Sequence, residues 1–96
     1  MKTAIELIID ERVRQISAEG WTPEHDDQHT DGELAKAASC YAFPHNGGSY
    51  FQDLRIANWP WHPGWWKPSP DNRIRELVKA GALIAAEIDR LQRINP

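Results

Sequence analysis

The chain has 96 residues, 41% hydrophobic and 26% charged, with a formal net charge of −3 at pH 7, and this length predicts one domain with a modest core. The negative charge counts against general nucleic-acid binding, which needs a basic face that releases counterions. No apolar run approaches the roughly 20 residues of a membrane helix, and Cys40 is the lone cysteine, so we expect a cytoplasmic protein without disulfides or membrane contact.

The first predicted helix covers residues 3–18. Thr3 and Glu6 have the spacing of a capping box, in which two side chains satisfy backbone N–H groups at the start of a helix. Gly20 is a natural end, because glycine readily adopts the left-handed conformation that closes helices. Apolar residues recur at helical spacing between these limits and predict a core-facing stripe of Ile5, Ile9, Val13 and Ile16.

The second predicted helix covers residues 31–42. Thr30 and Glu33 repeat the capping arrangement, and Pro44 ends the helix. Cys40 lies on or near the apolar side, which favours a buried thiol over a reactive nucleophile. The apolar stripe is short and rich in alanine, so another helix can approach closely; it consists of Leu34, Ala37, Ala38 and Tyr41.

The third predicted helix covers residues 70–93 and opens at Ser69-Pro70-Asp71, because proline is tolerated in a first turn. We expect it to pack across the other two helices. Gly81 costs about 1 kcal/mol relative to alanine in a helix interior, which predicts close packing of a neighbour there. The apolar stripe is the most regular in the chain and consists of Ile74, Leu77, Val78, Gly81, Ile84, Ile88 and Leu91.

Residues 43–69 are too many for an ordinary connection in a compact domain. We expect an ordered loop folded over one end of the helices, because disordered segments lack aromatic residues. Residues 50–54 have the composition of a short helix or strand within this loop. The fold class is therefore all-α: a small three-helix domain with a long ordered tryptophan- and proline-rich loop between the second and third helices.

The turn after the first helix carries the first candidate site. From Glu19 to Glu33 the chain has six acidic residues and no lysine or arginine. Such a cluster can hold sugar hydroxyls, bind a metal, or form a solvated loop with helix caps, and the last of these is the most common case. The candidate ligand-binding residues in this turn are Trp21, His25, Asp26, Asp27 and His29.

A metal site is the weaker interpretation of this turn. His25 and His29 are four residues apart, a spacing that on a helix places both imidazoles on one face. Pro23 and a helix start at Thr30 leave little room for such a helix. A structural zinc site also favours several cysteines, and Cys40 is alone. We therefore assign no metal ligands and no cofactor.

The tryptophan-rich segment and nearby basic residues form the second candidate site. The indoles either cap the core or offer a stacking wall, where base–aromatic stacking is worth about 1–3 kcal/mol per base. Guanidinium groups match pairs of phosphate oxygens, and helix amino ends favour anions, although a solvated basic face is the more common case. The candidate residues are Trp59, Trp61, Trp65, Trp66, Lys67, Arg73 and Arg75, together with Arg12 and Arg14 from the first helix.

These groups match the three parts of a nucleotide: indoles for the base, arginines for phosphate, and Asp26 and Asp27 for ribose hydroxyls. His25 and His29 would orient the aspartates or contact the ligand. Catalytic motifs are missing, since the chain has no phosphate loop and no paired cysteines. Metal-dependent all-α nucleotide pyrophosphohydrolases use Glu-x-x-Glu and Glu-x-x-Asp. Here only Glu24 and Asp27 have the second spacing, in an expected loop.

Two resemblances accompany these residues. The weaker one covers Arg14 through Asp27, which is similar to the ryanodine-receptor-type domain. That domain is a small helical module whose bacterial copies are thought to sense nucleotide-like ligands. The chain resembles more specifically a family of small uncharacterised phage and prophage proteins. That likeness rests on Glu11-Arg12, Arg14-Gln15-Ile16, Glu19-Gly20-Trp21-Thr22-Pro23-Glu24-His25-Asp26-Asp27, His29, Gly32-Glu33-Leu34-Ala35, Trp59-Pro60-Trp61, Trp65-Trp66-Lys67-Pro68 and Leu77-Val78-Lys79-Ala80.

The phage resemblance implies a protein that disarms host defence in the host cytoplasm. We expect it to sequester a nucleotide-derived immune signal, such as an ADP-ribose derivative or a cyclic nucleotide, without cleaving it. The alternatives are a metal-assisted nucleotide hydrolase and a protein inhibitor that docks its tryptophans on a host enzyme. We also expect a homodimer or higher homo-oligomer, because a small chain has little interior for a nucleotide pocket and the residues past Ile84 can supply contact.

Overall fold

The computed structural model describes residues 1–44, 55 and 57–95. Over these residues the chain is helical and contains no strand, which confirms the predicted all-α class. Three main helices are present: α1 (Ala4–Glu19), α3 (Glu33–Ala42) and α5 (Arg73–Ile94). Two short pieces accompany them, α2 (Pro23–Asp26) and the 3₁₀ turn η1 (Pro63–Trp65). The main helices start and end within three residues of the predicted bounds.

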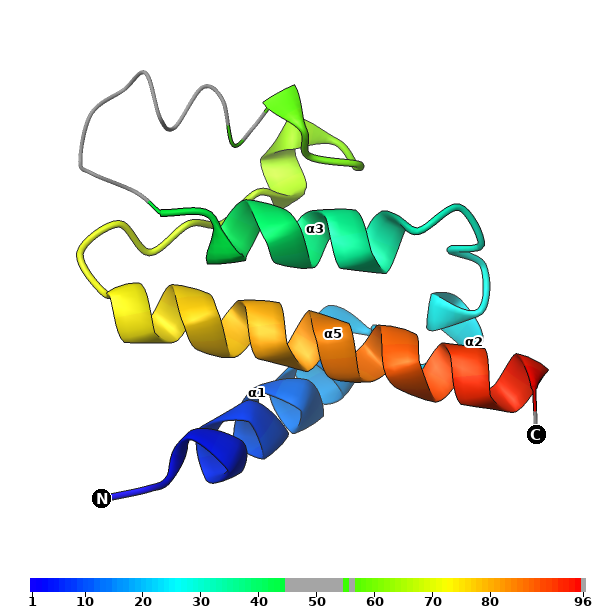
Figure 1. Cartoon of the computed structure of the whole chain (residues 1–96), viewed down its shortest axis with the longest axis horizontal. Helices are drawn as coiled ribbons and strands as arrows, with labels where there is room; N and C mark the ends of the chain where they lie inside the picture. Colours follow the sequence, from blue (N-terminus) through cyan, green and yellow to red (C-terminus); the bar gives the residue numbers. More distant parts are fainter. Residues whose placement is uncertain (45–54, 56, 96) are drawn as a thin grey trace.

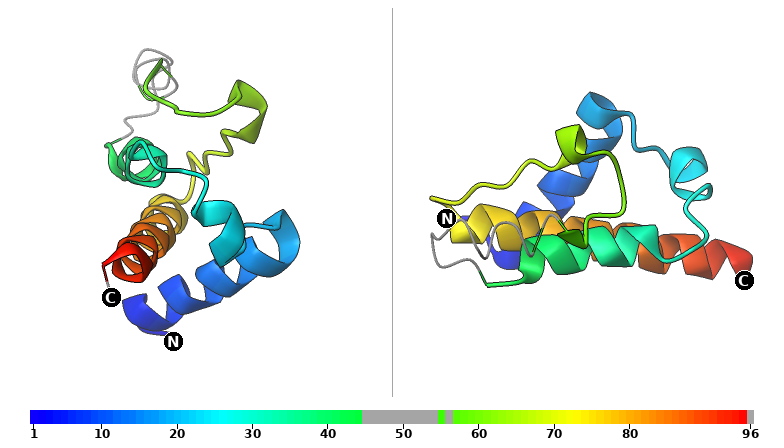
Figure 2. Two further views of the ribbon diagram at one scale, coloured as in Figure 1. Left: turned by 90° about the vertical axis from the view of Figure 1, so that its right-hand side faces the viewer. Right: turned by 90° about the horizontal axis from the view of Figure 1, so that it is seen from above.

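Helix α5 is the centre of the domain. It contacts α3, α1 and α2. Figure 1 shows α3 running alongside it, and α1 crossing it obliquely. The end-on view in Figure 2 places α3 and α1 on different sides of α5, with the segment of residues 57–66 beyond α3. The long helix thus packs across the other two, as the sequence predicts.

The ends of α1 form as predicted. Thr3 Oγ1 accepts a hydrogen bond from the Glu6 N–H at 3.3 Å, and the Thr3 N–H donates to Glu6 Oε1 at 2.9 Å. Gly20 ends the helix with φ of 74°, a left-handed conformation that favours glycine. The chain can therefore turn sharply into the acidic segment, where Trp21 follows directly.

The start of α3 differs from the prediction. Gly32, with φ of 79°, is the residue before the helix, and no side chain caps it there. Glu33 Oε1 instead accepts from the Asp31 N–H at 2.6 Å. The expected Thr30 cap is therefore wrong, because the left-handed glycine separates Thr30 from the first helical turn. At α5, Asn72 supplies the cap through Oδ1, which accepts from the Arg75 N–H at 3.0 Å.

Helix α2 forms where we expected too little room for a helix. Thr22 Oγ1 accepts from the His25 N–H at 3.2 Å, and Pro23 occupies the first turn, where its missing N–H is not needed. The single turn is followed by the bond from the His29 N–H to the Asp26 carbonyl at 3.0 Å. As a result His25 and His29 lie together, with ring centroids 5.1 Å apart.

The core lies between α3 and α5. Its small residues let the two helix backbones approach, and Leu34 and Leu83 fill the space with large side chains. The Cys40 side chain is buried here, as predicted, and burial raises the pKa of its thiol. A raised pKa keeps the thiol protonated and therefore unreactive. The buried apolar cluster comprises Leu34, Ala37, Ala38, Cys40, Tyr41, Trp59, Ala80, Leu83 and Ala86.

The regular apolar stripes of α1 and α5 mostly face outward, and for α1 this contradicts the expected core-facing stripe. Helix α1 instead turns Glu11 and Gln15 inward, and both are buried. The physical reason is charge pairing: the Glu11 carboxylate meets arginines from two helices, so it can be buried without losing its partners. At the crossing, Ile8 lies on Gly81, where an added Cβ would be 2.6 Å from Ile8 Cδ1. Close packing at Gly81 is confirmed.

Arg55 ties the tryptophan-rich segment to the helices. Its side chain is fully buried; Nε donates to the Cys40 carbonyl at 2.9 Å and Nη2 to Glu76 Oε2 at 3.0 Å. Its guanidinium also lies over the Trp66 ring, 4.9 Å from the centroid. The segment is thus ordered here, as predicted. The short element expected at residues 50–54 lies outside the described residues.

Candidate functional site

A cavity of about 380 Å³ opens where the end of α1, helix α2, the start of α3 and the tryptophan-rich segment meet. Its position follows from the sharp turn at Gly20 and from the anchoring of the tryptophan-rich segment on α3. Its walls are aromatic and acidic, and no lysine or arginine is among them. The lining residues are Glu19, Gly20, Trp21, His25, Asp26, His29, Leu34, Trp61, His62 and Trp65.

Four rings form a continuous aromatic wall. The Trp61 ring lies 5.9 Å from Trp21 and 5.0 Å from His29, and His29 lies 5.1 Å from His25, all between centroids. The planes are tilted or perpendicular, an arrangement that aromatic pairs prefer to a direct sandwich. His29 Nδ1 also lies 3.3 Å from Glu33 Oε2, which holds that ring in place. A flat ligand in the cavity would meet this wall.

Asp26 is a buried carboxylate at the base of the cavity. One of its oxygens pairs with Arg12, whose other terminal nitrogen donates to the Trp21 carbonyl at 3.1 Å. Burial raises the pKa of Asp26, and the positive charge of Arg12 opposes that rise without cancelling it. Arg12 therefore braces the turn from behind and leaves the second Asp26 oxygen buried and unpaired.

Three polar atoms of the lining residues are buried and have no hydrogen-bond partner in the described part of the chain. They are Asp26 Oδ1, Trp61 Nε1 and His25 Nδ1. An unpaired buried polar group costs about 1–3 kcal/mol, so such groups are rare in folded proteins and three around one cavity require an explanation. A polar ligand would supply the missing partners.

The tryptophans divide between core and cavity. Trp59 and Trp66 pack on Tyr41, with centroids 5.5 Å and 4.7 Å from its ring, and Trp59 Nε1 donates to the His62 carbonyl at 3.2 Å. Trp61 and Trp65 line the cavity instead. Trp65 is 49% exposed because it lies in η1 at the rim.

The candidate arginines do not line the cavity. Arg14 pairs with Glu11 and Glu19, and Arg75 pairs with Glu11. Arg73 donates to the carbonyls that end α3, including that of Tyr41 at 2.9 Å. The remaining candidate of the acidic turn, Asp27, pairs with Arg93 of α5 at 2.6 Å and also lies outside the cavity wall.

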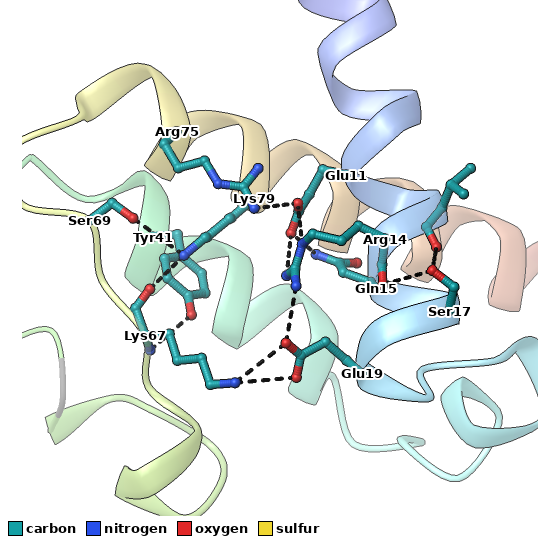
Figure 3. A network of polar contacts seen from close by, with 11 residues as sticks. Glu11, Arg14, Gln15, Ser17, Glu19, Tyr41, Lys67, Ser69, Arg75 and Lys79 are labelled. Atoms are coloured by element: carbon teal, nitrogen blue, oxygen red, sulfur yellow. Dashed lines mark hydrogen bonds and ion pairs between the residues drawn. The ribbon is translucent and has the colours of Figure 1, made fainter.

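A smaller hollow of about 20 Å³ adjoins the cavity, sharing Glu19, Trp21 and Trp65 with it. Figure 3 shows the polar network that lines the hollow. Lys67 Nζ lies 3.4 Å from both Glu19 oxygens, and its backbone N–H donates to the Tyr41 hydroxyl at 3.2 Å. Cationic groups thus lie just beyond the aromatic rim, and two of them, Lys67 and Arg14, pair with Glu19 of the cavity wall.

Burial and pairing control the ionisation of this network. Burial raises the pKa of Tyr41 to about 12, so the hydroxyl keeps its proton. Burial, with Arg75 adding to it, lowers the pKa of Lys79, whose ammonium donates to the Lys67 carbonyl at 2.7 Å. Burial alone would raise the pKa of Glu19, but hydrogen bonds from Arg14 and Lys67 outweigh it and lower the value.

Sequence reasoning missed four lining residues: Glu19, Gly20, Leu34 and His62. Glu19 and Gly20 directly precede Trp21 at the end of α1, so their closeness in sequence to a predicted site residue could have indicated them. Leu34 fits the predicted core stripe and reaches the cavity from its other side. His62 lies between two tryptophans, and no spacing rule distinguishes it.

Two further observations bear on function. Within residues 1–44, 55 and 57–95, no group of three histidine, cysteine or acidic side chains is arranged to hold a metal ion. No helix in the same residues is long and apolar enough to span a membrane. Comparison with protein-family models, curated proteins and solved structures finds no match for this chain. The two resemblances therefore rest on sequence motifs alone.

Proposed function

We propose that this protein binds a nucleotide-derived small molecule in the cavity and releases it unchanged. The observation that carries the proposal is the set of three buried polar atoms without partners, all from residues of the aromatic cavity wall: Asp26 Oδ1, Trp61 Nε1 and His25 Nδ1. A ligand that drew these side chains toward it would give each atom the partner it lacks.

The chemistry of the wall fits a nucleobase. The carboxylate oxygen of Asp26 accepts a hydrogen bond and the indole N–H of Trp61 donates one. The edge of a base such as adenine carries an amine donor beside a ring-nitrogen acceptor, so it complements both groups. The tilted rings of Trp21 and Trp61 offer faces for the base plane, and the volume lies in the range of small-molecule pockets.

The charges indicate where a phosphate would lie. The cavity wall has acidic residues and no lysine or arginine, so it favours the base over a phosphate. Lys67, Arg14 and Lys79 line the adjoining hollow, beyond Trp65. A ligand with its base in the cavity would extend its phosphate past the rim toward Lys67, which is exposed and paired only weakly with Glu19 at 3.4 Å.

Binding without cleavage is favoured over the two alternative functions. A metal-assisted hydrolase needs a cluster of metal ligands, and the described residues hold none. A protein inhibitor would dock through exposed tryptophans, and of the described tryptophans only Trp65 is more than a third exposed. Sequestration of a nucleotide-derived defence signal, in the cytoplasm of a phage-infected cell, is the role that the phage resemblance implies.

The test is mass spectrometry of the small molecules released when the purified protein is heat-denatured, followed by titration with AMP, ADP-ribose and cyclic AMP. We expect a released nucleotide derivative of unchanged mass. The Trp61→Phe variant keeps a ring but loses the N–H donor, so its affinity for the best probe should fall about 2- to 10-fold. Asp27→Asn, outside the cavity, should bind as the wild type does.

Three results would contradict this proposal. One is a protein that carries no small molecule and binds none of the probes at millimolar concentration. Another is turnover of a probe into products. The last is equal loss of affinity in Trp61→Phe and Asp27→Asn, which would mean that the cavity is not the binding site.

A further inference from the structure

A broad apolar surface covers one side of the domain. Nine aliphatic side chains of α1 and α5 are between 45% and 67% exposed, whereas the buried large aliphatic residues of the described chain are only Leu34, Val78 and Leu83. More large aliphatic side chains therefore face water than fill the core. The exposed ones are Ile5, Ile9, Val13, Ile74, Leu77, Ile84, Ile88, Leu91 and Ile94.

These residues form two stripes, and α1 crosses the α5 stripe at Gly81. On α1 the spacing is four residues throughout, and on α5 each step, counting Gly81, is three or four residues, so each stripe runs along one helix face. No charged residue interrupts either stripe. We name the two stripes together the aliphatic face.

The two helices cross within the α5 stripe. Ile8 of α1 lies against Gly81, and Gly81 belongs to the α5 stripe. On α1, Ile5 is three residues before Ile8 and Ile9 is one residue after it, so the α1 stripe passes close to the crossing. Figure 2 shows that α3 covers a different side of α5 from α1. The aliphatic face therefore lies on a side that α3 leaves uncovered.

We infer that the aliphatic face is the interface of a homodimer, with a second copy of this chain as its occupant. Nine half-exposed aliphatic residues present on the order of 800 Å², which matches the roughly 800 Å² that each partner buries in a standard stable interface. Soluble monomers rarely expose an apolar patch larger than about 300–600 Å². A twofold axis lets this uncharged surface cover itself, because the same patch serves both partners.

A lipid surface fits this face less well than a second copy. Helices that lie on membranes carry a lysine- and arginine-rich polar face, which attracts anionic lipid. On α1 the residues beside the stripe include Glu6 and Asp10, and the whole chain carries a net charge of −3. Acidic groups at the border would repel anionic headgroups, while they remain in water at the rim of a protein dimer.

The dimer differs from the oligomer expected at first, in which the ligand pocket was shared between chains. The cavity lies within one chain, and none of its lining residues belongs to the aliphatic face. Dimerisation and ligand binding are therefore separate properties. Loss of one in a variant should leave the other intact, and the dimer does not rest on the proposed ligand.

Light scattering of the full chain at about 50 μM tests the interface. We expect twice the 11.0 kDa mass of one chain. Ile88→Glu places two carboxylates in the interface, one from each copy, and should weaken dimerisation at least about 100-fold without unfolding a chain in which Ile88 is already exposed. Ala35→Glu adds the same charge at an exposed position of α3 and should leave the mass doubled.

A thiol probe gives a second measurement. Cys40 is buried, so Ile88→Cys and Ala35→Cys each carry one accessible thiol. Maleimide should label Ile88→Cys more slowly than Ala35→Cys at 50 μM, and equally fast after dilution below the dimer dissociation constant. The interface is excluded by a wild-type mass of 11.0 kDa at 50 μM. A doubled mass in Ile88→Glu, equal labelling at 50 μM, or co-purification with a different protein in place of a second copy would also exclude it.

Discussion

At the scale of single residues, the buried pair of Arg55 and Glu76 is one of the contacts that tie the tryptophan-rich segment to the helices. Both side chains are almost completely buried, and Glu76 also accepts from the Ser69 N–H at 3.1 Å. A buried carboxylate with several donors is stable, but removing its charge leaves the guanidinium uncompensated. The segment that carries Trp59 and Trp61 is held to α5 through this pair.

We therefore predict that Glu76→Gln destabilises the protein by about 3–5 kcal/mol, because Arg55 would be left buried without a counter-charge. Urea unfolding followed by circular dichroism measures this. Asp27→Asn breaks the exposed pair with Arg93 and should cost less than about 1 kcal/mol. If the two variants unfold at similar urea concentrations, the Arg55 pair does not anchor the segment.

The sequence predicted the residues of the acidic turn that line the cavity, but it did not predict that the candidate arginines lie outside it. Trp21, His25, Asp26 and His29 lie close in sequence, so one tight turn brings them together and their chemistry was visible in the chain. Whether an arginine is free depends on contacts across the fold. Arg75, for example, is paired with Glu11, which is 64 residues away in sequence, and no local pattern reveals that pairing.

At the scale of elements, the crossing of α1 and α5 depends on Gly81. An alanine there would place Cβ 2.6 Å from Ile8 Cδ1 and 2.9 Å from Ile8 Cγ1. Overpacking of this kind costs about 1–3 kcal/mol, while alanine gains about 1 kcal/mol in helix propensity. The steric clash lowers stability and the helix propensity raises it. The size of the side chain at residue 8 therefore decides whether Gly81→Ala stabilises or destabilises the protein.

We predict that Gly81→Ala lowers stability in the wild-type background and raises it in an Ile8→Ala background. Removing the Ile8 side chain abolishes the clash and leaves only the gain in helix propensity of about 1 kcal/mol. A double-mutant cycle of urea unfolding energies measures the coupling. Additive effects would show that Ile8 and Gly81 do not constrain one another.

The helices themselves were predictable because their caps and periodicity are local. Thr3 with Glu6, and Gly20, place the ends of α1 without reference to other elements. The direction that each helix faces was not predictable in the same way. A polar residue such as Glu11 can be buried once Arg14 and Arg75 surround it, and this frees the aliphatic face to point outward. An apolar stripe predicts that one face of a helix is buried, but the element that buries it can belong to another chain.

At the scale of the whole molecule, acidic side chains link stability to pH. Burial would raise the pKa of Glu11, but hydrogen bonds and charge from Arg14 and Arg75 outweigh it and lower the value below the ordinary 4.5. A lowered pKa means that the folded state releases this proton more readily than the unfolded chain. The resulting stabilisation is complete above about pH 4.5 and is lost as the pH falls through the folded value.

We predict that the unfolding free energy drops below pH 4.5 and that Glu11→Gln flattens this dependence. The variant should also lose about 1.5–3 kcal/mol at pH 7, the range for a hydrogen bond to a charged group. Urea midpoints between pH 7 and pH 3 measure both effects, with the exposed Glu24→Gln as control. Asp26 has the opposite effect on the unfolding free energy. Its pKa is raised in the folded state, so protonation of Asp26 on acidification favours the folded state. An unchanged pH curve in Glu11→Gln would contradict the assignment.

The Arg55 anchor also has a consequence for the order in which the protein is made. Synthesis proceeds from the amino end, and chain segments fold as they emerge from the ribosome. Arg55, Trp59 and Trp61 all leave before Glu76 does, so the carboxylate that neutralises Arg55 is absent when the aromatic wall is first available. The nascent chain can form α1, α2 and α3, but the cavity can close only after the first turn of α5 has left the ribosome.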